Sequence, residues 1–123
     1  MFKLVETYRY WWPVIVKMPD PDKPGKMVEQ QLKVLFESID QDEALAAQEV
    51  YEQLTSVRDR IEHERAQLLK VVKGWEGVEA EDKMPIDFSE EMFRMAMQKP
   101  WFRTAVYLAH ADSLIGREAA VGN

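Results

Sequence analysis

"YRYWWPVIVKMPDPDKPGKMVEQQLKVLFES", residues 8–38, holds two apolar-rich runs on either side of a turn. In the first run aromatic and β-branched residues dominate, which is typical of a strand. The turn, residues 19–26, holds three prolines and one glycine and cannot continue a strand. In the second run the apolar residues lie mostly on one side: Val28, Leu32, Val34 and Phe36. The pattern predicts an antiparallel β-hairpin over about residues 4–38 with one face in water.

The rest of the chain must cover the apolar face of this hairpin. Pro13 has no N–H to donate, which indicates either an edge position for the first strand or a break or bulge after Trp12. Because an isolated hairpin is only marginally stable in water, helices from the later sequence are expected to pack on it. The expected fold is therefore α+β, an N-terminal antiparallel β-hairpin followed by three or four α-helices. With 123 residues, the chain fits one domain at about 1–116 and a flexible tail at 117–123.

A long helical segment is expected directly after the hairpin. Asp40, with Glu43 three residues later, is typical of a helix start. Apolar residues then recur at helical spacing: Val50, Leu54, Val57, Ile61, Leu68, Val72 and Trp75. The spacing predicts one helix, or two closely joined helices, over about 41–73, with any break between residues 61 and 68. Gly74 is expected to end this segment in the left-handed conformation.

Two further helices are expected near the C-terminus, at 89–98 and 100–115. Ser89 is a good N-cap, and Phe88 and Phe93 are spaced to pack across that helix start. Pro100 ends one helix and suits the first position of the next. Gly116 is expected to end the last helix. Its buried stripe is predicted to consist of Trp101, Phe102, Ala105, Val106, Ala109 and Ile115.

Composition and charge oppose several functional classes. The chain has 22 acidic and 16 basic residues, a net charge of -6, whereas nucleic-acid binding depends on a surplus of Lys and Arg. A DNA-binding regulator is therefore disfavoured. There is no cysteine for a disulfide, a catalytic thiolate or a Cys-ligated zinc site. The absence of cysteine favours a reducing cytoplasm, and because charged residues interrupt every long apolar run, we expect no signal peptide and no membrane span.

Catalytic and metal-binding motifs are also missing from the sequence. There is no Gly-x-Ser-x-Gly turn and no phosphate-binding loop. His63 and His110 have no partners at converging helical spacing; His63 is expected on a solvated helix face and His110 on a helix face with no special role. A calcium loop needs alternating ligands and a glycine, which the carboxylates of residues 79–87 do not match. We predict no catalytic residue, no metal ligand and no cofactor, and a small enzyme or metal protein using this acidic loop is kept as an alternative.

The methionines suggest a surface for an apolar partner. Met84, Met92, Met95 and Met97 lie close together in the sequence, and methionine is common where varied apolar partners bind. The alternative is that Met92 and Met95 fill the core of a short helix; Met97 cannot fully share their face. The predicted partner-binding residues are Val50, Leu54, Val57, Met84, Met92, Met95 and Met97.

Three segments of the chain form a distinctive combination. They are TYRYWWPVIVKMP with its PDPDKPGK turn, LKVLFESI, and VVKGWEGVEAEDKMPIDFSEE. The last is the most specific, with Gly74, Trp75 and Gly77 before an acidic stretch, and Phe88-Ser89 opening a helix. Pro100 and Trp101 follow at the next helix break. Together these segments resemble the tail assembly chaperones of long-tailed bacteriophages and prophages, over about residues 8–110. Asp82-Lys83 and Asp87 depart from the family pattern, in which a glycine and a second proline are common.

The resemblance implies a role in virion assembly without enzymatic activity. Members of this family bind the tape measure protein, which is long, helical and apolar, keep it soluble and help recruit the major tail protein. In many members a ribosomal frameshift makes a longer form that contacts the major tail protein. The expected partners are thus the tape measure protein and, chiefly through such a longer form, the major tail protein, with no nucleic acid and no membrane. A homo-oligomer stays open, and the alternative is a structural subunit of a phage tail or baseplate. Trp75 is expected to be a structural anchor at the corner between helices.

Overall fold

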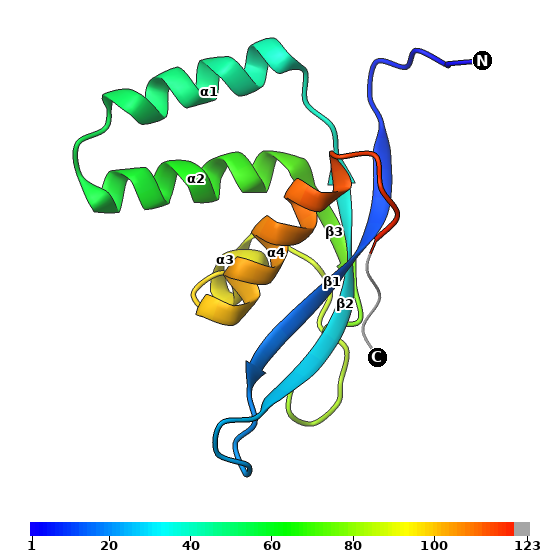
Figure 1. The fold of residues 1–123 in the computed structure, drawn as a ribbon, viewed down its shortest axis with the longest axis vertical. Coiled ribbons are helices and arrows are strands. Elements are labelled where there is room, and N and C mark those ends of the chain that lie inside the picture. The colour runs from blue at the N-terminus through cyan, green and yellow to red at the C-terminus, as the bar shows by residue number, and fades with distance from the viewer. Residues whose placement is uncertain (120–123) are drawn as a thin grey trace.

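The computed structural model describes residues 1–119, and its α+β class confirms the prediction (Figure 1). Residues 120–123 of the predicted tail lie outside the described residues. The elements in chain order are β1 (Arg9–Pro19), β2 (Met27–Glu37), α1 (Gln41–Gln53), α2 (Val57–Val71), β3 (Val72–Glu76), α3 (Glu90–Ala96) and α4 (Pro100–Ser113).

The sheet has three antiparallel strands in the order β1-β2-β3. β1 and β2 form the predicted hairpin, paired from Arg9 opposite Glu37 to Pro19 opposite Met27. The first strand begins at Arg9 rather than near residue 4. Pro13 lies on the edge strand, one of the two predicted alternatives, where its missing N–H is tolerated.

The third strand, β3, was not predicted, and the expectation for Gly74 was wrong. α2 ends at Val71, and Val72 both caps it and begins β3, so Gly74 lies within a strand. β3 pairs with the free edge of β2, with a bulge beside Leu35. The left-handed backbone belongs to Gly77, with φ +87°, where the chain leaves the sheet. Val71 and Val72 are β-branched and suit a strand. Pairing with the open edge of β2 therefore outweighs the helical spacing of the apolar residues in this segment.

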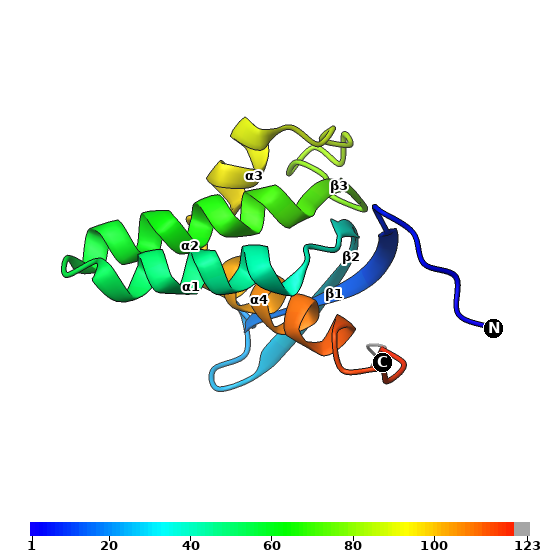
Figure 2. The same cartoon turned by 90° about the horizontal axis from the view of Figure 1, so that it is seen from above.

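The segment predicted as one helix or a closely joined pair is an antiparallel helical hairpin (Figures 1 and 2). Its break lies at residues 54–56, not between 61 and 68. Ser56 explains the position, because its side chain accepts a hydrogen bond from the Asp59 N–H at 3.3 Å and caps α2. Asp40 is the N-cap residue of α1, but its side chain makes no capping hydrogen bond. The single apolar stripe from Val50 to Trp75 therefore does not exist.

All four helices of the described chain lie on one face of the sheet (Figures 1 and 2). The core combines the inner face of the strands, the C-terminal end of α2, and residues of α3 and α4. Its fully buried large side chains are Phe36, Phe93, Met97, Val14, Val34 and Val106. The N-terminal half of α2 and the whole of α1 add no buried residue. The helical hairpin thus extends from the body with only one end anchored.

Trp75 is buried in this core, as predicted, with 7% of its surface exposed. Its indole Nε1–H donates to the Ile86 carbonyl at 2.8 Å, which ties the loop of residues 77–89 to β3. The rings of Phe88, Phe93 and Phe102 surround it at centroid distances of 5.5, 6.3 and 6.3 Å. Trp75 therefore joins the sheet, the loop and both C-terminal helices.

The start signals of the last two helices are confirmed. The Ser89 hydroxyl accepts from the Met92 N–H at 3.1 Å, and the rings of Phe88 and Phe93 meet edge to face at 6.0 Å. Pro100 is the first residue of α4. α3 runs from Glu90 to Ala96 and is therefore shorter than the predicted helix over 89–98.

The predicted buried stripe of α4 was wrong at its two ends. Ala105, Val106 and Ala109 are buried, whereas Trp101 is 42% exposed and Ile115 lies exposed beyond the end of the helix. Seven residues are close to two helical turns, so Trp101 shares a solvent-facing side of α4 with the exposed Leu108. α4 ends at Ser113, before Gly116 is reached.

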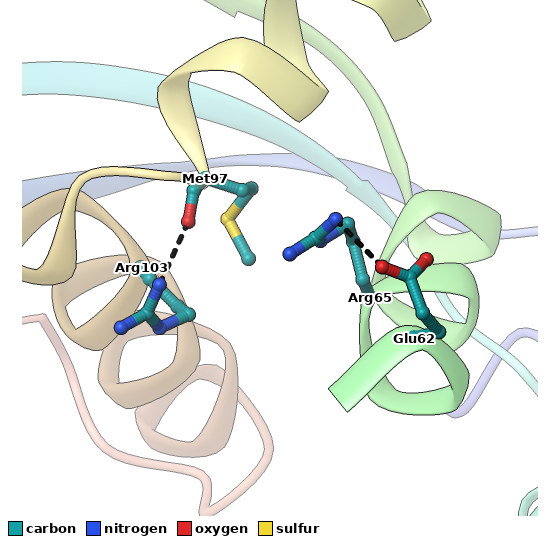
Figure 3. A network of polar contacts seen from close by, with 4 residues as sticks. All are labelled: Glu62, Arg65, Met97 and Arg103. Atoms are coloured by element: carbon teal, nitrogen blue, oxygen red, sulfur yellow. Dashed lines mark hydrogen bonds and ion pairs between the residues drawn. The ribbon is translucent and has the colours of Figure 1, made fainter. Parts of the chain in front are cut away.

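Met92 is half-buried against the core, but Met95 and Met97 differ from the expected core filling at the C-terminal end of α3. Met97 is fully buried at 0% exposure, whereas Met95 is 57% exposed. Met97 caps the end of α3, and its side chain lies between Arg65 of α2 and Arg103 of α4 (Figure 3). The Arg103 guanidinium donates to the Met97 carbonyl at 3.0 Å and so ends α3 against α4. The turn into α4, which helical spacing alone does not reveal, directs Met97 inward.

Candidate functional site

A cleft of about 420 Å³ opens between α1, α2 and α4. We call it the helical cleft. α1 contributes Ala44, Ala47, Gln48 and Tyr51, α2 contributes His63, Glu64, Gln67, Leu68 and Val71, α4 contributes Tyr107 and His110, and Ile39 precedes α1. Most of this lining is apolar or aromatic, with a few polar groups, which is the usual composition of a binding site.

α1 forms one wall of the helical cleft and is held by few contacts. His63 Nε2–H donates to the Ala47 carbonyl at 2.9 Å. The Tyr51 ring lies 6.1 Å from the His63 ring and 5.2 Å from the Arg60 guanidinium. Because no residue of α1 is buried, little hydrophobic free energy fixes the position of this wall.

The titratable groups on the α4 side of the helical cleft are neutral at neutral pH. Burial lowers the pKa of His110, whose ring packs 5.1 Å from that of Phe36. Burial, and then the nearby Glu64 carboxylate, raise the pKa of Tyr107, while Arg103 and Arg65 act in the opposite direction. The wall formed by α4 therefore offers uncharged hydrogen-bonding groups among apolar surface.

The hydrogen bonds of His63 in the helical cleft and of Asp82 in the acidic loop run to backbone groups. His63 is hydrogen-bonded to a backbone carbonyl, and within residues 1–119 no hydrogen bond links its ring to a carboxylate. The same part of the chain has no cluster of three His, Asp or Glu placed to hold a metal ion. In the acidic loop, Asp82 accepts from the Met84 N–H at 3.0 Å and so stabilises the turn itself. What the geometry offers is recognition of an apolar or amphipathic surface.

A second cleft, of about 820 Å³, lies at the other end of the sheet. It is bounded by the turn end of the β-hairpin, the loop after Gly77 and the corner between α3 and α4. Val16, Met18, Leu32, Val78 and Phe102 supply apolar lining, Trp101 is exposed within it, and Glu79, Glu81, Lys83 and Lys99 add charges of both signs. Gly77 and Trp101, two of the residues on which the family resemblance rests, therefore line this second cleft.

The predicted partner-binding residues do not form one surface. Val50, Leu54 and Val57 surround the turn of the helical hairpin, where Val50 and Val57 are exposed. Met84 is exposed in the loop of residues 77–89, Met95 is exposed on α3, Met92 is half-buried and Met97 lies in the core. None of them lines the helical cleft.

The residues that sequence reasoning missed lie on the inner side of α1. Ala44, Ala47 and Tyr51 recur at spacings of three and four, which is a helical stripe. Alanine contributes little to an apolar pattern because its side chain is small. The prediction therefore followed the larger Val50 and Leu54, which lie on another side of the helix. On α4, the small residues Ala105 and Ala109 are buried, and Tyr107 and His110 face the helical cleft.

Comparison with known proteins adds no family, because no protein-family model, no curated protein and no solved structure matches the chain. Within residues 1–119, the helices are all too short or too polar to cross a membrane.

Proposed function

We propose that the chain is a non-enzymatic tail assembly chaperone of a long-tailed phage or prophage. In this role it binds the tape measure protein in the host cytoplasm and keeps it soluble. It also helps recruit the major tail protein, chiefly through a longer frameshifted form. The proposal rests on the resemblance of residues 8–110 to that family and on a surface suited to a helical, apolar client.

The observation that best supports this function is the weakly anchored α1 beside the helical cleft. A long apolar client presents many different helical segments, so its chaperone needs an adaptable groove. α1 has no buried residue and can shift against α2 at low cost, whereas α4 is fixed by the core. A helix with an apolar stripe could lie along the cleft against Ala44, Ala47 and Tyr51.

Co-expression with the tape measure protein encoded nearby tests this proposal. The expected result is a soluble complex that co-purifies, while the tape measure protein alone aggregates. A tape measure protein that is equally soluble without this chain would contradict the chaperone function.

Two matched alanine substitutions on α1 test the cleft. Ala44 and Ala46 are both exposed, but only Ala44 lines the helical cleft. Ala44→Glu puts a charge where the client would exclude water, so it should weaken binding about tenfold or more. Ala46→Glu makes the same change on the same helix and should leave binding within about twofold. Equal effects of the two variants would exclude the helical cleft as the binding site.

The alternative is a permanent structural subunit of a phage tail or baseplate. It is favoured by apolar surface outside the helical cleft, notably Trp11 on the sheet and Leu108 on α4. Quantitative mass spectrometry of purified virions separates the two functions. A structural subunit is present at stoichiometric amounts, whereas a chaperone is lost before the virion is complete.

A further inference from the structure

Within residues 1–119, no helix lies on the face of the sheet opposite α1–α4 (Figures 1 and 2). Its centre is Trp11, which is 46% exposed. Trp11 of β1 lies opposite Leu35 of β2, which lies opposite Gly74 of β3, so the three form one row across the sheet. We call Trp11, Pro13, Ile15, Leu35 and Gly74 the outer-face patch.

Gly74 leaves room for the Trp11 indole on this face. A Cβ at Gly74 would lie 3.9 Å from the end of the indole ring and 3.7 Å from the Leu35 side chain. Any longer side chain would have to displace one of them. The indole therefore reaches across β2 toward β3 and joins the three strands in one apolar surface, to which another sheet can pack.

Charges of both signs border the outer-face patch. Two residues along the strands from the pair of Trp11 and Leu35, the Arg9 guanidinium pairs with the Glu37 carboxylate at 2.8 Å. In the row on the other side, Lys33 lies opposite Glu76 on the neighbouring strand. An acidic and a basic side chain of β2, Glu37 and Lys33, thus stand at equal distances along the strand from Leu35.

This pattern is complementary to itself under one rotation. Consider two copies facing each other, related by a two-fold axis that runs across the strands through the row of Leu35. Glu37 of each copy then lies opposite Lys33 of the other, and the Trp11 rows meet at the centre. An axis parallel to the strands would instead set Lys33 against Lys33 and Glu37 against Glu37, which repel.

We propose that the outer-face patch binds a second copy of this chain, with the two-fold axis across the strands. The contact is isologous, with Trp11 as its central anchor and reciprocal pairs of Glu37 and Lys33 at its border. A lipid or nucleic-acid surface would be expected to select a single sign of charge, whereas this border carries both. The contact leaves the helical cleft on the other side of the sheet free.

Analytical ultracentrifugation of the full chain tests the dimer. We expect a monomer–dimer equilibrium for the unmodified chain and about a tenfold or greater rise in Kd for Trp11→Ala. Leu108→Ala, an exposed apolar residue on α4, is the matched control and should leave Kd unchanged. A monomer at every concentration, or a dimer that Trp11→Ala does not weaken, would overturn the proposal.

Charge reversal on β2 tests the orientation and does not depend on how well Trp11→Ala folds. Lys33→Glu and Glu37→Lys should each weaken the dimer, because each sets like charges opposite one another. The double variant K33E/E37K restores opposite charges and should recover most of the lost affinity, although Arg9 then has a lysine neighbour. A double variant that is weaker than both single variants would exclude this two-fold arrangement.

Discussion

Replacing Trp75 with phenylalanine should destabilise the protein through the loss of one hydrogen bond and of part of one ring. Trp75→Phe removes the indole N–H that donates to the Ile86 carbonyl at 2.8 Å. An unpaired acceptor in a largely buried position costs about 1–3 kcal/mol. The smaller ring also leaves a void of about one or two methylene groups, at about 0.8 kcal/mol each. The free energy of unfolding should therefore fall by about 2–5 kcal/mol, a large part of the stability of a domain of this size.

Urea unfolding followed by far-UV circular dichroism measures this change without depending on tryptophan fluorescence. Trp101→Phe is the matched control, because Trp101 is 42% exposed and should cost no more than about 0.5 kcal/mol. Hydrogen exchange should also show faster opening of the loop of residues 77–89 in Trp75→Phe. A loss below about 1 kcal/mol, or one equal to that of Trp101→Phe, would refute the role of Trp75 as the anchor of this corner.

Three further predictions follow from burial and backbone geometry. Met97→Ala should lower the free energy of unfolding by about 2–5 kcal/mol, and Met95→Ala by about 0.5 kcal/mol or less, because Met97 is 0% and Met95 57% exposed. Urea unfolding measures both values, and similar losses for the two variants would contradict the inward direction of the Met97 side chain. Gly77→Ala should lower the melting temperature by about as much as Gly25→Ala, because both glycines have positive φ and a Cβ at Gly77 would meet Leu32 only in ordinary van der Waals contact, at 3.5 Å; a much larger drop for Gly77→Ala would contradict this. Burial lowers the pKa of His110 below its ordinary 6.5, so the unfolded chain binds that proton first. The stabilising effect of its neutral form is complete above pH 6.5 and is lost as the pH falls through the folded-state pKa. In urea unfolding at decreasing pH, His110→Gln should therefore lose less stability than the unmodified chain.

The parts of the fold that the sequence predicted correctly depend on local chemistry. The turn at residues 19–26 follows from proline and glycine, which restrict or free the backbone wherever they stand. Ser89 and Pro100 mark helix starts for similar reasons, because a side-chain oxygen and a missing N–H act within one helical turn. The same logic at Ser56 would have located the break between α1 and α2, but the apolar spacing across it led to the wrong prediction.

The candidate site was less predictable because burial depends on partners distant in the sequence. Val50 and Leu54 are the larger apolar residues near the end of α1, yet the helical cleft is lined by Ala44, Ala47 and Tyr51. Which side of α1 faces the cleft depends on how α2 packs on the sheet, so the stripe of Ala44, Ala47 and Tyr51 could not be chosen over the larger apolar residues from the sequence of α1 alone. The resemblance to tail assembly chaperones stays a prediction for the experiments above to decide.

By itself, the sequence determined the β-hairpin, the α+β class and the starts of α3 and α4, because neighbouring residues act on one another through sterics and hydrogen bonds. Only the tertiary structure decided that residues 72–76 form a strand, since the free edge of β2 offers hydrogen bonds that the helical spacing does not reveal. It also decided that Met97 is buried and that Trp11 is 46% exposed. Packing assigns each apolar residue to core or surface, and packing depends on contacts that local spacing does not encode.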